Sequence, residues 1–373
     1  MHKQLLGGLS AHQFLTEYWQ KKPLLIRQAW TDFPELIDLP RLIELAARDD
    51  TESRLIEYRQ GKWLVERGPL RPSRFDRLPD TDWTVLVQSV NQHVPHIADL
   101  LYQFDFLPWT RLDDLMISYA PPGGTVGPHY DSYDVFLLQV GGRKRWQISS
   151  DDAGNFVEDA PIRVLRDFNS QQEWILEHGD MLYLPPKYAH YGVALDEGMT
   201  YSIGFRAPTA QEVVGKFLEH LQDELKLEGM YGDPERLPAE HPGEIDQMFV
   251  DKITGLIDQL RWNEGDIRQF IGRYFSEPKT HVFYETPEEP LDFDEFAAAV
   301  AEQGVALDLK SIMLYEGAHI YINGETLEAE ESALPVLRQL ADARSLPAGD
   351  YNDDVIEALY NCYDYGYLAP TKI

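Results

Sequence analysis

The chain has 373 residues, of which 43% are hydrophobic and 12% aromatic, so it can bury cores for two or three domains. Its formal net charge of −30 argues against direct binding of nucleic acid and favours a basic partner. No apolar run reaches the roughly 18 residues that a membrane span needs, and the first residues do not resemble a signal peptide. We therefore expect a cytoplasmic protein without membrane contact. The single cysteine, Cys362, leaves histidines and carboxylates as the metal ligands to consider.

The first part of the chain mixes helix and strand, and a long β-rich region follows. Ser10 can cap a short helix that runs to Tyr18, and residues 23–26 are typical of a strand. Short strands separated by Gly, Pro and Asp turns then suggest a barrel or sandwich. The predicted strands are Leu115–Ala120, Asp134–Val140, Lys144–Ser149, Glu173–Leu176, Met181–Leu184 and Thr200–Phe205.

After Pro208 the apolar residues recur at helical intervals, which predicts helices over 211–227, 245–260 and 266–275. From Leu291 onward we expect a helix, two strands joined by Asn323-Gly324, and two further helices, an order that resembles a winged helix. The expected domains are residues 1–208 with a core over 113–208, a helical region over 209–277, and a C-terminal winged-helix-like domain over 278–373.

Two short segments supply a candidate metal site. His129 and Asp131 are two residues apart, so in an extended strand both side chains point to the same face. His190 follows Pro185-Pro186 and would reach the same ion from another strand, beyond a turn at the rim of the barrel. Two imidazoles and one carboxylate are the ligand set of a non-haem Fe(II) oxygenase, which leaves coordination positions open for a bidentate co-substrate and dioxygen.

A second His-x-Asp sequence serves as an internal control. His178-Gly179-Asp180 lies between two predicted strands, where Gly-Asp is ordinary turn chemistry. We therefore interpret it as a hairpin connection and not as a second metal site.

Lys144 is the candidate for binding an anionic co-substrate. In the predicted strand it shares a face with Trp146 and Ile148, which places an ammonium group on the apolar side. A buried lysine needs an anionic partner. That partner is either a structural carboxylate or, next to Fe(II), the distal carboxylate of 2-oxoglutarate.

Four motifs together resemble the JmjC ribosomal oxygenases, and the likeness extends over most of the chain. They are His129-Tyr130-Asp131, Arg143-Lys144-Arg145-Trp146, the run from Gly179 through Pro186 to His190, and Tyr201-Ser202-Ile203-Gly204-Phe205-Arg206-Ala207-Pro208. The resemblance implies an α+β protein: a double-stranded β-helix of the cupin type, a helical dimerisation region and a C-terminal winged helix. It also implies a homodimer.

The resemblance further implies an enzyme that uses Fe(II), 2-oxoglutarate and O2 to hydroxylate a basic ribosomal protein, with an arginine of large-subunit ribosomal protein sixteen as the expected target. The metal ligands would be His129, Asp131 and His190. Lys144 would bind 2-oxoglutarate where bacterial members often have arginine, and Ser118 and Ser202 are further candidates for hydrogen bonds to it. Residues near the triad could form a pocket for a cationic side chain; they are Tyr133, Asp134 and Tyr119.

Three alternatives remain open on the sequence. The same metal set could hydroxylate lysine or histidine, or remove an N-methyl group. A non-catalytic cupin that only binds a ligand is the third reading, and the complete triad together with Lys144 argues against it.

Overall fold

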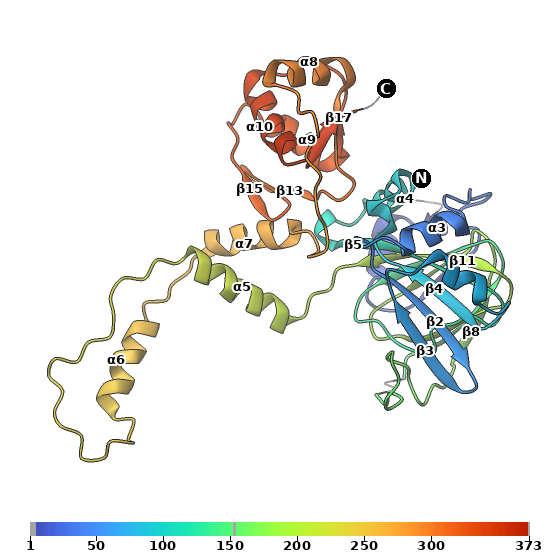
Figure 1. Cartoon of the computed structure of the whole chain (residues 1–373), viewed down its shortest axis with the longest axis horizontal. Coiled ribbons are helices and arrows are strands. Elements are labelled where there is room, and N and C mark those ends of the chain that lie inside the picture. Colours follow the sequence, from blue (N-terminus) through green and yellow to red (C-terminus); the bar gives the residue numbers. More distant parts are fainter. Residues whose placement is uncertain (1–4, 152–153, 372–373) are drawn as a thin grey trace.

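Figure 1 shows a computed structural model that describes residues 5–151 and 154–371. A β-rich body contains the N-terminal half of the chain, and the C-terminal part forms a separate compact unit beside it. Helices connect the two, and α6 (Gln247–Ile257) lies far out on an extended arm. Within the described residues, no helix is long and apolar enough to span a membrane.

Two antiparallel sheets build the body. The larger sheet has the strand order β1-β9-β6-β11-β5-β4-β2-β3, and the smaller has the order β10-β7-β8. The strands of the larger sheet are β1 (Leu24–Ile26), β2 (Ser53–Arg59), β3 (Lys62–Arg67), β4 (Trp83–Val87), β5 (Leu112–Ala120), β6 (Val135–Val140), β9 (Met181–Leu184) and β11 (Gly198–Phe205). Those of the smaller sheet are β7 (Lys144–Ser149), β8 (Gln172–Leu176) and β10 (Ala189–Ala194). The predicted β-rich core is confirmed.

The two faces of the larger sheet have different surroundings because side chains alternate along each strand. On β11, Met199, Tyr201 and Ile203 join the main hydrophobic core with residues of the N-terminal helices. The helices of this region are α2 (Ala11–Glu17), α3 (Leu39–Ala46) and α4 (Pro95–Leu101), with 3-10 turns η1 (Pro72–Arg77), η2 (Val90–Gln92), η3 (Tyr102–Phe104) and η4 (Trp109–Arg111). The opposite face looks into the barrel, where a smaller apolar cluster joins both sheets.

The predicted cap of the first helix is confirmed. Ser10 Oγ accepts a hydrogen bond from the Gln13 amide at 3.1 Å, and the Gln13 side chain accepts one from the Ser10 amide at 2.9 Å. This reciprocal pair satisfies two amides that the helix itself cannot bond.

The strand that carries His190 was expected, but its bounds were not predicted. Residues 185–188 form the expected turn, and Ala189–Ala194 is strand β10, which pairs with β7. Strands β2, β3 and β4 were not predicted. The sequence between the Pro pair and Gly192 lacks the run of β-branched residues that signals a strand. Its pairing with β7 decides its conformation.

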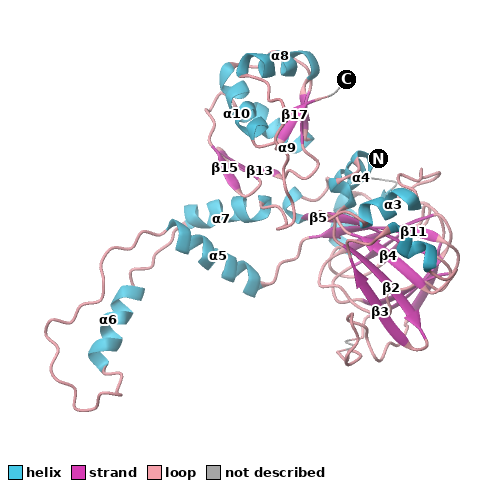
Figure 2. Ribbon diagram, in the orientation of Figure 1, coloured by secondary structure: helices cyan, strands magenta, loops and turns pink. Residues whose placement is uncertain are grey.

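The helical region contains α5 (Ala210–Glu224), α6 and α7 (Glu264–Ser276), in agreement with the predicted helices. Figure 2 shows that long loops lead to and from α6. Asp246 and Asn263 cap α6 and α7 with side-chain hydrogen bonds. Helix α7 packs against the C-terminal part so closely that a Cβ at Gly272 would lie 2.2 Å from the Tyr321 ring.

The C-terminal part has its own hydrophobic core. Its Asn323-Gly324 turn joins two strands, as predicted, and both residues have positive φ. The elements are α8 (Phe293–Gln303), β12 (Val305–Leu307), β13 (Met313–Glu316), β14 (His319–Ile322), β15 (Glu325–Leu327), α9 (Leu334–Ala343), β16 (Ser345–Leu346), α10 (Asp353–Asp364) and β17 (Leu368–Pro370).

Candidate metal and co-substrate site

The structure brings the three predicted metal ligands together. His129 and His190 form an isolated antiparallel bridge, in which the His129 amide donates to the His190 carbonyl at 3.0 Å and the reverse bond measures 2.7 Å. Asp131 lies two residues further on, and its Oδ2 is 3.7 Å from His190 Nε2. One ligand atom from each residue lies within 4.8 Å of the others. This spacing and donor set suit a divalent metal ion.

The chain's own carbonyl groups orient both imidazoles. His129 Nδ1 is 2.9 Å from the Gly127 carbonyl, and His190 Nδ1 is 3.0 Å from the Tyr188 carbonyl. A carbonyl can only accept, so each Nδ1 carries the proton and each Nε2 keeps a lone pair for a metal. Burial lowers the pKa of His190 to about 4, which keeps this imidazole neutral and able to coordinate.

Lys144 lies beside this triad on the inner side of β7, as predicted. Its Nζ donates to Thr200 Oγ1 at 3.0 Å and lies 4.7 Å from the centre of the Trp146 ring. Among the described residues no carboxylate pairs with it, and burial lowers its pKa to about 8. A desolvated ammonium without a counter-ion fits an anionic ligand such as the distal carboxylate of 2-oxoglutarate.

A glycine makes room for this arrangement. Gly192 on β10 pairs with Trp146 on β7. A Cβ at position 192 would lie 2.7 Å from the Trp146 ring and 2.9 Å from Lys144 Cε. Any side chain here would therefore displace Lys144 or Trp146.

The predicted serines occupy the same inner face, together with a residue that the sequence reading missed. Ser118 on β5 is directly opposite Thr200 on β11, and Ser202 follows two residues later. All three are buried. The missed residue is Thr200, whose hydroxyl accepts from Lys144. Its position two residues before Ser202 on one strand is the signal that could have identified it.

The three predicted substrate-binding residues do not lie together. Tyr133 is 39% exposed; burial of its phenol, followed by the nearby Asp131, Asp114 and Asp113 carboxylates, raises its pKa. Tyr119 is adjacent to Ser118 and so points to the opposite side of the sheet, where its hydroxyl donates to Glu197 at 3.3 Å.

Asp134 is completely buried and has partners of its own. It accepts hydrogen bonds from the Tyr183 hydroxyl at 2.6 Å and the Gln20 amide group at 3.0 Å, with Arg111 at 3.5 Å. Burial raises its pKa in spite of these contacts. This geometry favours a structural role for Asp134, and the expected substrate contact remains a prediction.

The second His-x-Asp sequence forms a turn, as predicted, but the turn does not close a hairpin. Gly179 has a φ of +85° between β8 and β9, and these two strands belong to different sheets. Asp180 pairs with Arg27 at 2.6 Å, and His178 Nδ1 accepts from the Gly141 amide. These contacts account for both residues without a metal.

A double-stranded β-helix with a His-Asp-His triad and a buried cation defines an Fe(II)- and 2-oxoglutarate-dependent oxygenase, and comparisons with known proteins agree. Residues 99–213 match the JmjC domain family, and residues 259–369 match the ROXA-like winged helix, a segment that includes α7. The Escherichia coli "Ribosomal protein uL16 3-hydroxylase" is 34% identical over 91% of both chains. The "Probable ribosomal oxygenase" of Haemophilus influenzae is 34% identical over 89% of this chain and 86% of its own.

Solved structures give the same result. The E. coli ribosomal oxygenase YcfD in complex with cobalt and 2-oxoglutarate superposes with a TM-score of 0.81 at 33% identity, covering 96% of this chain and 98% of that one. The chain therefore belongs to the JmjC ribosomal oxygenases, which use Fe(II), 2-oxoglutarate and O2.

Proposed function

We propose that this protein hydroxylates an arginine of the large-subunit ribosomal protein uL16. The similarity to the E. coli uL16 3-hydroxylase over 91% of both chains supports the substrate protein. The net charge of −30 suits a basic protein partner, which it would attract over long range. The arginine side chain is our expectation for the residue that is modified.

The observation that carries this proposal is a backbone-fixed triad next to Lys144, which pairs with no carboxylate in the part of the chain that the structure describes. His129, Asp131 and His190 would hold Fe(II), which supplies the oxidising chemistry when bound. Lys144 and Thr200 would bind the distal carboxylate of 2-oxoglutarate, while Ser118 and Ser202 line the same inner face. Because lysine offers a point charge and not a planar fork, the hydroxyl of Thr200 would help to fix the direction of that contact.

Tyr133 is the best placed of the predicted substrate residues. It is two residues beyond Asp131, partly exposed, and close to the Asp113 and Asp114 carboxylates. A partly exposed aromatic ring suits a guanidinium group. We infer that Tyr133 lies where the substrate side chain enters.

We also propose that the protein is a cytoplasmic homodimer. Apolar side chains of the helical region are exposed in the single chain: Val214 is 54%, Leu218 50% and Ile257 64% accessible. Exposed apolar residues on helices that extend away from the body indicate a surface that a second copy covers (Figure 2).

The test is mass spectrometry of uL16 after incubation with the purified protein, Fe(II), ascorbate and 2-oxoglutarate. We expect a gain of one oxygen on an arginine, and no gain with His129→Ala. An added oxygen on lysine or histidine, or loss of a methyl group, would replace the proposed residue type. Iron-dependent consumption of 2-oxoglutarate without any change in uL16 would retain the oxygenase and reject this substrate.

A further inference from the structure

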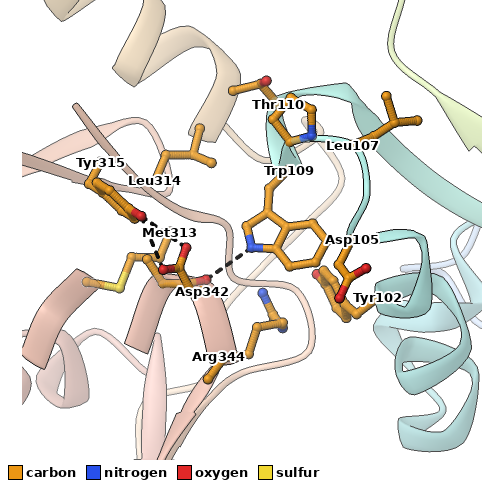
Figure 3. Close-up of a pocket in the computed structure, with 13 residues that line it drawn as sticks. Tyr102, Asp105, Leu107, Trp109, Thr110, Met313, Leu314, Tyr315, Asp342 and Arg344 are labelled. Carbon is orange, nitrogen blue, oxygen red and sulfur yellow. Dashed lines mark hydrogen bonds between the residues drawn. The ribbon is translucent and has the colours of Figure 1, made fainter. Parts of the chain in front are cut away.

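A cavity of about 670 Å³ lies between the β-rich body and the C-terminal part (Figure 3). Tyr102, Asp105 and residues 107–110 line it from the body, and β13 and the end of α9 line it from the other side. Trp109 spans the boundary, because its indole Nε1 donates to the Ala341 carbonyl at 3.2 Å. The volume is within the range of ordinary ligand sites and can accept a long side chain.

The polar groups of this cavity favour a cation. Asp105 and Asp342 are exposed residues of its lining. The Tyr315 hydroxyl donates to both carboxylate oxygens of Asp342, at 3.2 and 3.1 Å. Helix α9 ends at Ala343, so the negative end of its dipole also lies at this wall.

The aromatic groups favour the same kind of ligand. Tyr102, Trp109 and Tyr315 all contribute to the walls, and ring faces attract ammonium and guanidinium groups. Arg344 already lies 4.3 Å from the centre of the Tyr102 ring. Its guanidinium donates to the carbonyls of Ser311 and Asp308, so its charge is held by the wall of the C-terminal part.

The cavity is connected to the metal site through one continuous segment. η4, which contributes Trp109 and Thr110, leads directly into β5. Near the start of β5, Asp113 and Asp114 lie near Tyr133 and contact Lys279 at 3.1 and 3.3 Å. The cavity and Tyr133 therefore lie at the same end of β5.

We propose that the cavity binds an arginine or lysine side chain of the basic protein substrate, distinct from the residue that is hydroxylated. This inference rests on the proposed function. The body and the C-terminal part then recognise the substrate jointly, and the winged helix acts in substrate selection.

The test compares full-length uL16 with a short uL16 peptide that contains only the hydroxylated residue and its neighbours. Asp342→Lys reverses the charge of the cavity wall. We expect it to raise KM for full-length uL16 by about three- to tenfold while kcat and the peptide KM stay unchanged. Glu357→Lys reverses an exposed charge on α10, outside the cavity. It should leave the KM unchanged for both full-length uL16 and the peptide. Tyr315→Phe removes the hydrogen bond from the Tyr315 hydroxyl to Asp342, and its KM for full-length uL16 measures what that bond contributes.

Calorimetric binding of full-length uL16, without iron, gives a second readout. The wild type should bind it more tightly than Asp342→Lys by the same factor. If the wild type and Asp342→Lys bind full-length uL16 equally and have the same KM, the proposed role of the cavity is wrong. Turnover of the peptide would still support the proposed hydroxylase activity. A rise in KM for the peptide as well would mean that the substitution disturbs the metal site, which also overturns the inference. If the wild type neither binds nor modifies uL16, both proposals fail.

Discussion

The main chains of His129 and His190 form two hydrogen bonds with each other, of 3.0 and 2.7 Å, so backbone pairing places two metal ligands next to each other. Their ring centres are 4.2 Å apart. The arrangement does not depend on the imidazoles themselves. Side-chain substitutions should therefore separate metal binding from folding.

We expect His190→Ala to keep the fold and to weaken metal binding by at least about 100-fold, since even the indirect partners of metal ligands contribute about 10- to 100-fold. Calorimetric titration with Co²⁺ measures the affinity, and circular dichroism checks the fold. His178→Ala, in the other His-x-Asp sequence, is the matched control and should bind Co²⁺ like the wild type. Equal affinity in both variants would contradict the assigned triad.

Substitution of Lys144 should affect the co-substrate selectively. Lys144→Met removes a charged hydrogen-bond donor, a contact of about 1.5–3 kcal/mol, so the KM for 2-oxoglutarate should rise about 10- to 100-fold. Lys144→Arg keeps the charge and should retain most of the affinity, and Lys62→Met, an exposed lysine of β3, should have no effect. An unchanged KM in Lys144→Met would show that another group binds the carboxylate.

The pH dependence of co-substrate binding follows from the pKa of Lys144, which burial lowers to about 8. The protonated form, which binds an anion, predominates below that pH and is lost above it. Affinity for 2-oxoglutarate should thus fall as the pH rises through about 8. Lys144→Arg remains charged throughout and should show a flat profile over the same interval. Parallel profiles for the two proteins would assign the titration to a different group.

Gly192→Ala tests the close packing around Lys144. The new Cβ would meet the Trp146 ring at 2.7 Å, so the substitution should cost about 1–3 kcal/mol of unfolding free energy and raise the KM for 2-oxoglutarate. Gly215→Ala on α5 has no heavy atom within 4 Å of the new Cβ and should be neutral or stabilising. Denaturant unfolding of both variants checks the difference. Equal unfolding free energies for Gly192→Ala and Gly215→Ala would mean that β10 can shift to accept the methyl group without loss of stability.

A charged residue on α5 should dissociate the proposed dimer. Leu218→Glu places a carboxylate on an apolar surface that is 50% exposed in the single chain, and light scattering should then give the mass of one chain. Leu64→Glu on β3 changes a leucine of similar exposure, 48%, and should leave the mass unchanged. A dimer that survives Leu218→Glu would place the contact elsewhere.

The sequence predicted the regular elements well because their signals are local. Strands β7 and β9 have the predicted bounds, and the Ser10 cap is present. The metal triad could be predicted because His129 and Asp131 are two residues apart and His190 follows a Pro pair, although His129 forms an isolated bridge where a strand was expected.

Nearness in sequence was a poor guide to the rest of the site. Tyr119 follows Ser118 directly, and alternation along β5 sends the two side chains to opposite faces. Asp134 is three residues from Asp131, yet its carboxylate accepts hydrogen bonds from Tyr183 and Gln20 on the core side of the sheet. Thr200 reaches Lys144 only because two sheets face each other, a relation that no local pattern contains.

The buried Asp134 carboxylate has a consequence for how this protein can be shortened. Gln20, which donates to it, comes from the loop after the first helix, and the Gln20 amide also donates to Tyr183 at 2.8 Å. A chain that began at β2 would remove this hydrogen-bond donor from Asp134, which is completely buried in the full chain immediately before β6. The N-terminal segment is thus an integral part of the oxygenase, and a minimal catalytic unit cannot be cut at the edge of the β-rich core.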